Sequence, residues 1–331
     1  MNATFHNEDL SKINFLITGG AGFIGSNLVA YLLKNGAKKV RILDNLSTGY
    51  TDNIQEFLDL PQVEFIQGDI TDAETCLKAC EGIDYVSHQA ALGSVPRSLA
   101  NPLNTNAHNV TGFLNMLWAV KEQKVKRLVY ASSSSVYGDS PILPKQEHQI
   151  GKPLSPYALT KFINEMYADV FARSYGTEAI GLRYFNIFGY KQSPKGAYAA
   201  VIPLFMQALS ENKAPVINGD GEQSRDFTFV DNAVQANVKA MLSKHPEAAN
   251  KVYNVACGER FSVKELFLMI SEILGKDIEP IYGVARQGDV RNSLADISLA
   301  QKFLGYEPSI LAKEGLEKTV AWFLAQNHQK T

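Results

Sequence analysis

The stretch that decides the fold runs from Phe15 to Leu33, FLITGGAGFIGSNLVAYLL. It begins as an apolar run of strand length, ends with apolar residues at helical spacing, and places Gly19, Gly22 and Gly25 between the two. Three glycines between a strand and a helix let the backbone approach an anion closely, and the helix N-terminus attracts it. The stretch therefore predicts a cradle for the pyrophosphate of a dinucleotide.

An acidic residue follows at the distance that such a cradle requires. Asp44 ends the next apolar run, KVRILD, about 20 residues after the last of the glycines. Its carboxylate can accept hydrogen bonds from the ribose hydroxyls of adenosine and would repel a 2′-phosphate, so we expect NAD rather than NADP. Asp69 and Ile70 end the third run, where they could flank the adenine or form only a strand-end turn.

The alternation of strands and helices continues through the N-terminal half. The strand-like runs are INFLIT, KVRILD, VEFIQ, DYVSH, RLVYAS and AIGLRYF, and helix-length stretches lie near 24–35, near 102–123 and from Pro156 onward. This pattern predicts an α/β fold, a Rossmann-type doubly wound parallel sheet in an NAD-binding domain of residues 1–185. Helices near 199–211, 231–243, 262–274 and 311–327 predict a smaller C-terminal, substrate-binding α/β domain of residues 186–331, from which segments near 226–256 return to the first domain.

Composition argues against several kinds of partner. The 331 residues are 45% hydrophobic and 20% charged, with a formal net charge of −2 and no long basic run, so neither nucleic acid nor a membrane surface is expected. The polar N-terminal segment and the lack of an apolar run of ~18 residues predict a soluble, cytoplasmic protein. Cys76 and Cys80 lie one helical turn apart, but no cluster of Cys or His completes a metal shell, so we expect two buried helix residues and no metal.

Hydroxyl side chains gather directly after the run RLVYAS. Ser132 ends that run and Ser133 to Ser135 follow it, and Tyr157 and Lys161, four residues apart, begin a helix and share one of its faces. A phenol with a pKa of ~10 is a poor base at neutral pH, but a neighbouring ammonium and a positively charged nicotinamide would stabilise the phenolate. We therefore expect Tyr157 to take the proton of a sugar alcohol, Lys161 to lower its pKa, and Ser133 to hydrogen-bond the same alcohol.

Together these motifs resemble the extended short-chain dehydrogenase/reductase family, specifically its nucleotide-sugar branch, from Ile13 onward. The resemblance implies that Ser133, Tyr157 and Lys161 are catalytic. Dehydratases of this family carry Asp-Glu after the catalytic serine or threonine, and decarboxylases carry a glutamate at the second of these positions, where this chain has Ser134 and Ser135. Epimerisation at sugar carbon 4, through a bound 4-keto sugar with tightly bound NAD, is then the simplest reaction left.

The resemblance also implies a set of ligands for the cofactor and the UDP-sugar. The expected NAD-binding residues are Gly19, Gly22, Phe23, Ile24, Gly25, Asp44, Asn45, Asp69, Ile70, Gln89, Ala90, Ala91, Asn109, Tyr157, Lys161 and Tyr184. The expected substrate-binding residues are Gly93, Ser94, Ser133, Ser134, Ser135, Asn186, Ala200, Val201, Val216, Asn218, Arg225, Arg286, Asp289 and Ser293. Arg225 and Arg286 would grip the diphosphate, because a guanidinium fork matches phosphate oxygens.

Four segments narrow the resemblance to epimerases of UDP-N-acetylglucosamine and UDP-N-acetylgalactosamine: HQAALGSVPRS, GKPLSPYA, GAYAAVIP and GDVRNSLADI. Galactose-type relatives carry tyrosine at the position of Ser293 and often lysine at that of Gly93. The smaller residues here would leave room for an acetamido group, to which Ser94 would offer a hydroxyl. A bulky side chain against that group would cost about 1–3 kcal/mol.

Three alternatives remain open, together with the oligomeric state. The substrate could be UDP-N-acetylglucosaminuronate, with Arg97 or Lys191 meeting its carboxylate; the enzyme could be a UDP-glucose 4-epimerase of broad specificity; or the chain could be a non-catalytic dinucleotide sensor. The resemblance implies a homodimer joined by the helices near 102–123 and 156–175. Their apolar residues Phe113, Leu117, Phe162, Met166 and Val170 could form that interface or face the sheet instead.

Overall fold

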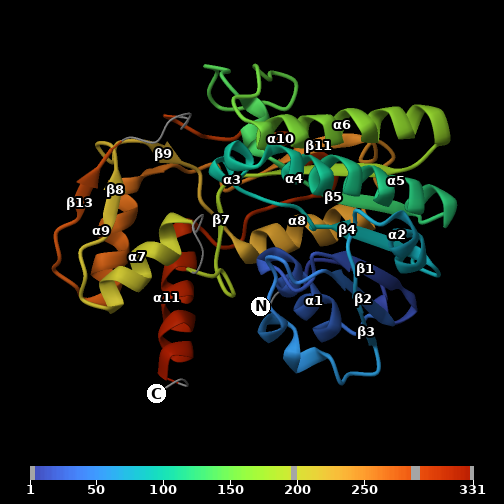
Figure 1. The fold of residues 1–331 in the computed structure, drawn as a ribbon, viewed down its shortest axis with the longest axis horizontal. Helices are drawn as coiled ribbons and strands as arrows, with labels where there is room; N and C mark the ends of the chain where they lie inside the picture. Colours follow the sequence, from blue (N-terminus) through green and yellow to red (C-terminus); the bar gives the residue numbers. More distant parts are fainter. Residues whose placement is uncertain (1–3, 195–199, 285–290, 329–331) are drawn as a thin grey trace.

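The computed structural model describes residues 4–194, 200–284 and 291–328, which form a large lobe and a smaller lobe (Figure 1). The large lobe is built on a sheet whose strands are β1 (Asn14–Thr18), β2 (Lys39–Asp44), β3 (Val63–Gln67), β4 (Tyr85–His88), β5 (Arg127–Ser133), β6 (Ala179–Tyr184) and β11 (Lys251–Val255). Short β-rich apolar runs such as Phe15–Thr18 form these strands, because a strand covered on both faces buries every side chain.

The strand order places a ligand crevice at the centre of this sheet. The seven strands follow the order β11-β6-β5-β4-β1-β2-β3, and all their pairings are parallel. The chain therefore moves outward from β1 through β2 and β3, then returns to β4 on the other side of β1. A doubly wound sheet binds ligands at the carboxyl ends of its strands where the order reverses. The predicted doubly wound parallel sheet is confirmed.

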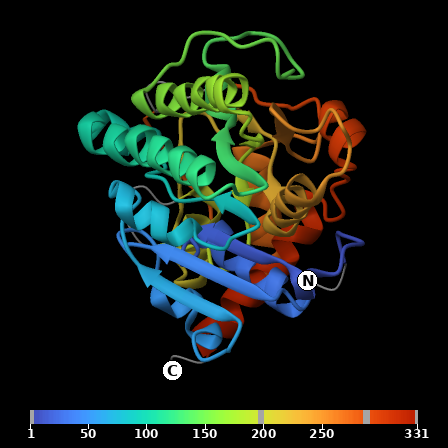
Figure 2. The same cartoon turned by 90° about the vertical axis from the view of Figure 1, so that its right-hand side faces the viewer.

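Helices cover both faces of the sheet. One face packs α1 (Phe23–Lys34) and α8 (Val230–Leu242), which contact each other. The other face packs α2 (Ala73–Cys80), α5 (Gly112–Glu122) and α6 (Pro156–Tyr175), and the last two run side by side in both views (Figures 1 and 2). Cys76 and Cys80 are buried in α2, as the sequence predicted.

The helix predicted near 102–123 is interrupted. It consists of α4 (Pro102–Asn106), a π-helical turn η4 (Ala107–Thr111) and α5, preceded by α3 (Val95–Ala100). Phe113 and Leu117 are fully buried against the sheet, so of the two alternatives the sheet-facing one holds for these two residues. On α6, by contrast, Met166 and Val170 are exposed.

The smaller lobe has its own core. It contains α7 (Val201–Ser210), α9 (Val263–Leu274) and α11 (Ala312–His328), with the strand pairs β8 (Val216–Asn218)–β13 (Ile281–Gly283) and β9 (Ser224–Arg225)–β12 (Phe261–Ser262). Phe205, Leu266 and Leu316 pack these helices together. The helix α9 begins at a capping box of Ser262 and Glu265 and ends at Gly275 in the left-handed conformation.

Segments of the C-terminal half also build the large lobe. The strand β11 pairs with β6 at the sheet edge, α8 packs beside α1, and α10 (Ser298–Leu304) packs on β11 and α8. The pair β7 (Ile187–Phe188) and β10 (Thr228–Phe229) lies where the chain passes between the lobes. Short 3-10 helices complete the description: η1 (Leu10–Lys12), η2 (Thr51–Asn53), η3 (Gln55–Phe57) and η5 (Ser134–Tyr137).

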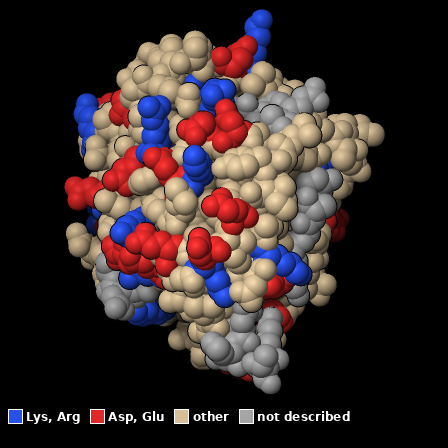
Figure 3. All heavy atoms as spheres, turned by 90° about the vertical axis from the view of Figure 1, so that its left-hand side faces the viewer, with Lys and Arg blue, Asp and Glu red and all other residues tan. Residues whose placement is uncertain are grey.

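Acidic and basic side chains are interspersed on the smaller-lobe face that Figure 3 displays. The described residues on this face form no extended basic area, although acidic groups gather in several places. A surface with both signs mixed provides no strong attraction for polyanions. Within the described ranges, no helix combines the length and the apolar character needed to cross a lipid bilayer.

Candidate active site

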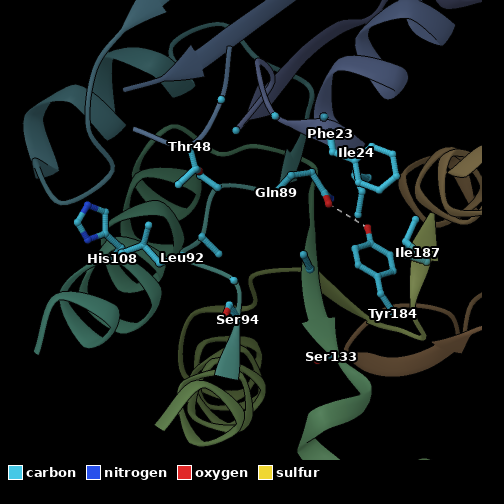
Figure 4. A pocket seen from close by; sticks show the side chains of 18 of the residues that line it. Phe23, Ile24, Thr48, Gln89, Leu92, Ser94, His108, Ser133, Tyr184 and Ile187 are labelled. Atoms are coloured by element: carbon cyan, nitrogen blue, oxygen red, sulfur yellow. Dashed lines mark hydrogen bonds between the residues drawn. The ribbon is translucent and has the colours of Figure 1, made fainter. Parts of the chain in front are cut away.

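A cavity of about 560 Å³ lies at the carboxyl ends of the central strands (Figure 4). Most of the predicted cofactor residues line it, namely Gly19, Gly22, Phe23, Ile24, Gly25, Asp44, Asn45, Ile70, Gln89, Ala90, Ala91, Tyr157, Lys161 and Tyr184. Six predicted substrate residues line it as well, namely Gly93, Ser94, Ser133, Ser134, Ser135 and Asn186. The fold therefore brings residues from distant parts of the sequence into one space.

The glycine turn after β1 forms one wall of this cavity and leaves no room for a side chain. Gly19 has a φ of +66°, and a Cβ there would lie 2.7 Å from the backbone nitrogen of Ala90. A Cβ on Gly25 would lie 2.2 Å from the carbonyl oxygen of Gly19. The turn opens directly onto the N-terminus of α1, whose Ncap is Gly22. Bare backbone at a helix N-terminus fits a pyrophosphate.

Asp44 lies at the end of β2, where the carboxylate of a ribose ligand is needed. Its Oδ2 accepts a hydrogen bond from the Ala21 N–H at 2.9 Å, and its Oδ1 accepts one from the Leu46 N–H at 2.9 Å. Burial raises the pKa of Asp44, and these two backbone bonds oppose that rise. Each carboxylate oxygen keeps a further lone pair for a ribose hydroxyl. The glycine turn and Asp44 therefore fit NAD.

Two predicted cofactor residues, Asp69 and Asn109, form hydrogen bonds with residues that line the cavity. Asp69 accepts a hydrogen bond from Asn45 Nδ2 at 2.7 Å and lies 3.5 Å from His108 Nε2. The amide of Asn109 accepts from the Leu92 N–H at 2.8 Å and donates to the Leu92 carbonyl at 3.1 Å. Neither is among the residues that line the three cavities described here.

His108 lines the main cavity, although no sequence motif singles it out. It belongs to the π-helical turn η4, which shifts the register of a helix that otherwise has an ordinary amphipathic pattern. Such turns occur often at functional sites, but nothing in the local sequence predicts this one. Thr48 and Gln192 line the same cavity. Both lie in loops whose sequence has no regular periodicity, so no pattern singles them out.

Ser133, Tyr157 and Lys161 meet in this cavity. Ser133 ends β5, where its hydroxyl accepts a hydrogen bond from the Ser135 N–H and donates one to the Ser135 hydroxyl, both at 3.1 Å. Tyr157 and Lys161 lie one turn apart near the start of α6, whose Ncap is Ser155. Lys161 Nζ donates to the carbonyl oxygen of Ala131 at 2.8 Å. One strand end and one helix start therefore fix all three groups.

Burial works against both charges that the expected chemistry needs. It raises the pKa of Tyr157, opposed by the hydrogen bond with Ser133. It also lowers the pKa of Lys161 to about 8. The expected lowering of the Tyr157 pKa by Lys161 is therefore not produced by the protein groups alone. A phenolate at neutral pH needs the further positive charge that the nicotinamide of NAD carries.

A buried polar network supports the floor of the cavity between β4 and β6. The hydroxyl of Tyr184 donates to Gln89 Oε1 at 3.1 Å, the contact drawn in Figure 4, and accepts from Asn237 Nδ2 at 2.7 Å. Asn237 Oδ1 accepts in turn from Gln89 Nε2 at 3.0 Å. Burial raises the pKa of Tyr184 to about 12, so this phenol stays protonated and keeps its donor role.

Two further cavities continue from the main one toward the smaller lobe. A cavity of about 280 Å³ is lined by Asn186, Ala200, Val201, Val216, Asn218 and Arg225, all predicted substrate ligands. A cavity of about 180 Å³ is lined by Ser134, Ser135, Asn186, Arg225 and Ser293, again all predicted. Asn186 lines all three cavities, so they adjoin one another. The predicted ligands Arg286 and Asp289 lie outside the described residues.

Two non-glycine residues with positive φ lie in these walls. Ser94 has a φ of +100° and Asn186 a φ of +38°. Asn186 is held by a hydrogen bond from its Nδ2 to the Asp226 carbonyl at 3.0 Å. Backbone in this region costs roughly 1–3 kcal/mol and persists where the surroundings fix it, often at functional sites. The strain therefore coincides with residues expected to contact the sugar nucleotide.

Lys145 is a lining residue of the smallest cavity that the sequence did not reveal. It is 4% exposed, and its Nζ donates to the Ser140 carbonyl. Its backbone pairs with the segment that carries Ser293, because the Lys145 N–H donates to the Leu294 carbonyl at 2.8 Å.

Lys191, by contrast, donates to the Asn53 carbonyl at 2.7 Å and pairs with Glu56. Neither Lys191 nor Arg97 lines any of these three cavities.

Comparison with known proteins gives consistent results. The sequence profile described as "NAD dependent epimerase/dehydratase family" matches residues 15–256. A "Putative UDP-glucose 4-epimerase" of Methanocaldococcus jannaschii is 39% identical over 94% of this chain and 99% of its own.

Two solved structures superpose on nearly the whole chain. One is the "UDP-N-acetylglucosamine 4-epimerase from Methanobrevibacter ruminantium M1 in complex with UDP-N-acetylmuramic acid", with 40% identity, a TM-score of 0.89 and coverage of 95% of this chain and 99% of that one. The other is a UDP-glucose 4-epimerase of Thermotoga maritima with UDP-glucose, with 37% identity, a TM-score of 0.89 and coverage of 95% and 100%.

Proposed function

Because this chain belongs to the NAD-dependent epimerase/dehydratase family, we propose that it is a UDP-sugar 4-epimerase that interconverts UDP-N-acetylglucosamine and UDP-N-acetylgalactosamine. The observation that supports an N-acetylated sugar as the substrate is the lining of the 180 Å³ cavity, which includes Ser134, Ser135 and Ser293. Three small hydroxyl side chains there leave space for an acetamido group and offer it hydrogen bonds.

The catalytic groups support proton transfer at the 4-hydroxyl of the sugar. Bound NAD supplies the acceptor and then the donor of the hydride at sugar carbon 4. Tyr157 takes the proton of the 4-hydroxyl and returns it after the keto sugar has turned its other face, so the stereochemistry inverts without net redox change. Lys161 stabilises the phenolate, and Ser133 hydrogen-bonds the same oxygen. The assembly of these groups in one cavity argues against a non-catalytic sensor.

Glycine at position 93 supports the wider sugar pocket. Gly93 lines the main cavity, and a Cβ at this position would meet no atom within 4 Å among the residues described. Neither backbone strain nor crowding therefore demands a glycine here. Its effect is to leave the wall open, next to the strained Ser94. A larger residue would enter the space that we assign to the sugar and its acetamido group.

The neighbouring cavity of about 280 Å³ fits the nucleotide part of the substrate. Val216 and Asn218 belong to β8 and provide backbone groups for the uracil, and Arg225 lines both this cavity and the one that contains Ser293. A guanidinium between the two is well placed for the diphosphate that joins uridine to the sugar. Ala200 and Val201, at the start of α7, complete the wall.

A second candidate substrate, UDP-N-acetylglucosaminuronate, is favoured by one observation. Lys145 is buried in the lining of the Ser293 cavity, and burial lowers the pKa of its amine from the usual value. A carboxylate on the sugar would compensate that buried positive charge. Arg97 and Lys191, which the sequence suggested for this role, line none of the three cavities. Lys145 is therefore the residue to examine if the uronate proves to be the better substrate.

We further propose a homodimer joined through α5 and α6. The side chains of Leu159, Met166 and Val170 on α6 are 47%, 54% and 43% exposed, and Trp118 on α5 is 41% exposed. The two helices lie side by side on the surface of the large lobe (Figure 2). Apolar side chains at helical spacing on adjacent exposed helices suit association with a second copy.

The substrate is tested by comparing specificity constants for UDP-N-acetylglucosamine, UDP-glucose and UDP-N-acetylglucosaminuronate, with the 4-epimers resolved by chromatography. The highest kcat/KM for the neutral acetylated sugar is the expected result. Preference for the uronate would replace the proposed substrate by the second candidate. Preference for UDP-glucose would mean that the small residues around Ser293 do not decide specificity, and turnover of none would favour a sensor.

A further inference from the structure

The acid–base pair on α6 is continued by a glutamate that faces the same strand end. Tyr157, Lys161 and Glu165 follow one another at intervals of four residues and therefore share one face of the helix. Lys161 Nζ donates to the Ala131 carbonyl, and Glu165 Oε1 accepts from the Ser132 hydroxyl at 2.5 Å. Two successive residues of β5 are thus tied to α6 immediately before Ser133.

Glu165 is also paired with a buried arginine of the next strand. Arg183 on β6 donates from Nε to Glu165 Oε1 at 2.9 Å and from Nη2 to Oε2 at 2.7 Å. The two side chains are only 3% and 8% exposed. Burial lowers the pKa of Arg183, but the contacts with Glu165 outweigh this and raise it, so the arginine stays charged. A bidentate pair of this kind holds two elements in a fixed orientation.

Arg183 connects α6 to the loop that follows Ser132 to Ser135. Its Nη1 donates to the Glu147 carbonyl at 2.9 Å, and its guanidinium lies 4.8 Å from the ring centre of Tyr137. The Tyr137 hydroxyl donates to Asn254 Oδ1 at 2.6 Å, and Asn254 Nδ2 donates to the Asp296 carbonyl at 2.9 Å. The same connected network therefore reaches the segment that carries Ser293.

We propose that Glu165 and Ser132 are positioning residues: with Arg183 they fix the distance between the end of β5 and helix α6, and so the placement of Ser133 against Tyr157. This rests on the proposed roles of Ser133 and Tyr157. It assigns a task to Ser132, the first serine of the run, which lines the main cavity, is 2% exposed and donates its hydroxyl hydrogen to Glu165.

The proposal predicts a loss of rate without a comparable loss of binding. Ser132→Ala removes one hydrogen bond and leaves the Glu165–Arg183 pair intact, so the protein should fold. We expect kcat to fall roughly 10-fold with KM little changed, because small displacements of reacting groups reduce rates strongly. The acidic limb of the kcat/KM profile should also move to higher pH, since the hydrogen bond with Ser133 lowers the Tyr157 pKa and a displaced Ser133 would weaken it.

A double variant separates positioning from stability. Replacing a buried ion pair by apolar residues of similar volume is often neutral or stabilising. Glu165→Met with Arg183→Met should therefore keep the melting temperature close to that of the wild type, yet reduce kcat roughly 100-fold. The control is Glu178→Met with Arg127→Met, which removes a more exposed arginine–glutamate pair at the other end of β5 and β6 and should leave kcat unchanged.

Two results would each overturn the proposed positioning role. A wild-type kcat and pH profile in Ser132→Ala would overturn the proposal, and so would wild-type activity in a folded Glu165→Met/Arg183→Met variant. If the double variant does not fold, Ser132→Ala alone decides. Tyr157→Phe, measured in parallel, keeps the two questions apart: undiminished activity there would refute the proposed catalytic role of Tyr157, whereas loss of activity there with an unaffected Ser132→Ala would refute only the positioning role.

Discussion

Lys161 Nζ lies 2.8 Å from the carbonyl oxygen of Ala131, to which it donates a hydrogen bond. This contact joins α6, the helix that carries Tyr157, to β5, the strand that ends at Ser133. Burial lowers the pKa of Lys161 from 10.5 to about 8, and no carboxylate opposes this shift. The charge of Lys161 is therefore sensitive to pH in a range where enzymes are usually assayed.

The first prediction concerns the alkaline pH dependence. As the pH rises through about 8, Lys161 loses its proton, its support for the Tyr157 phenolate disappears, and kcat/KM should fall. In Lys161→Met this limb should be absent and the remaining activity low. Lys191→Met is the matched control, because Lys191 is another lysine with a lowered pKa that donates to a backbone carbonyl. A limb near pH 8 that persists in Lys161→Met would show that another group titrates there.

The same shift predicts a change in stability. A lysine whose folded-state pKa is depressed releases its proton in the native state before it does so in the unfolded chain. Between pH 8 and 10.5, this group alone therefore makes the free energy of unfolding rise with pH. Its contribution is measured as the difference between wild type and Lys161→Met in denaturant unfolding at pH 7 and pH 10.

The second prediction concerns the proton acceptor. Tyr157→Phe removes the phenol oxygen but keeps the ring, so kcat should fall roughly 10²- to 10⁴-fold while the fold is retained. Tyr167→Phe, on the same helix but outside the cavities, should leave turnover unchanged. Near-normal epimerisation by Tyr157→Phe would remove this residue from the mechanism.

The third prediction concerns specificity. Ser293 is 7% exposed and lines the smallest cavity, so Ser293→Tyr should crowd an acetamido group. A cost of about 1–3 kcal/mol corresponds to a roughly 5- to 150-fold fall in kcat/KM for UDP-N-acetylglucosamine relative to UDP-glucose. Ser298→Tyr, at the exposed start of α10, is the control. An unchanged ratio between the two substrates would contradict the pocket assignment.

The fourth prediction concerns the cofactor. Asp44→Asn retains one acceptor oxygen but loses the negative charge, so the Kd of NAD should rise roughly 10- to 150-fold. Calorimetric titration after removal of copurified cofactor measures the change. Asp72→Asn, at the Ncap of α2 and outside the cavity, should not alter the Kd. Unchanged NAD affinity in Asp44→Asn would refute its role as the ribose ligand.

The fifth prediction concerns assembly. Two lysines at Met166 and Val170 would place positive charges on the exposed apolar face of α6, so Met166→Lys/Val170→Lys should shift a dimer to monomer. Light scattering at micromolar concentration measures the molar mass. Leu268→Lys, at a 54% exposed leucine on α9, is the control. A wild-type protein that is already monomeric would reject the interface.

Local patterns predicted the parallel sheet well. Apolar runs such as Phe15–Thr18 form strands, and Gly25 after the first of them is required by a contact with Gly19 in the same turn. The groups of the active cavity that follow strand ends, such as Asp44 and Ser133, could therefore be placed at one edge from strand order alone. Each of these residues directly follows an apolar run of strand length, and such runs can be recognised in the sequence.

Contacts between distant segments could not be predicted in this way. The π-helical turn around His108 changes a helix register without a sequence signal, and helical spacing alone left open whether Phe113 faces the sheet or a second subunit. Lys145 enters the site because its loop pairs with residues 294–296, about 150 positions later in the chain. The upward shift of the Tyr157 pKa likewise depends on burial, which only the packed structure reveals.

The pairing of β11 with β6 has a consequence for how the protein is made. During synthesis, β6 has left the ribosome well before β11, and until then the edge of β6 presents unpaired backbone groups. The cofactor-binding sheet can therefore be completed only after α7, β8 and β9 of the smaller lobe have been translated. A fragment ending after residue 185 should expose that edge and aggregate, so the nucleotide cradle and the sugar pocket are expected to mature together as one cooperative unit.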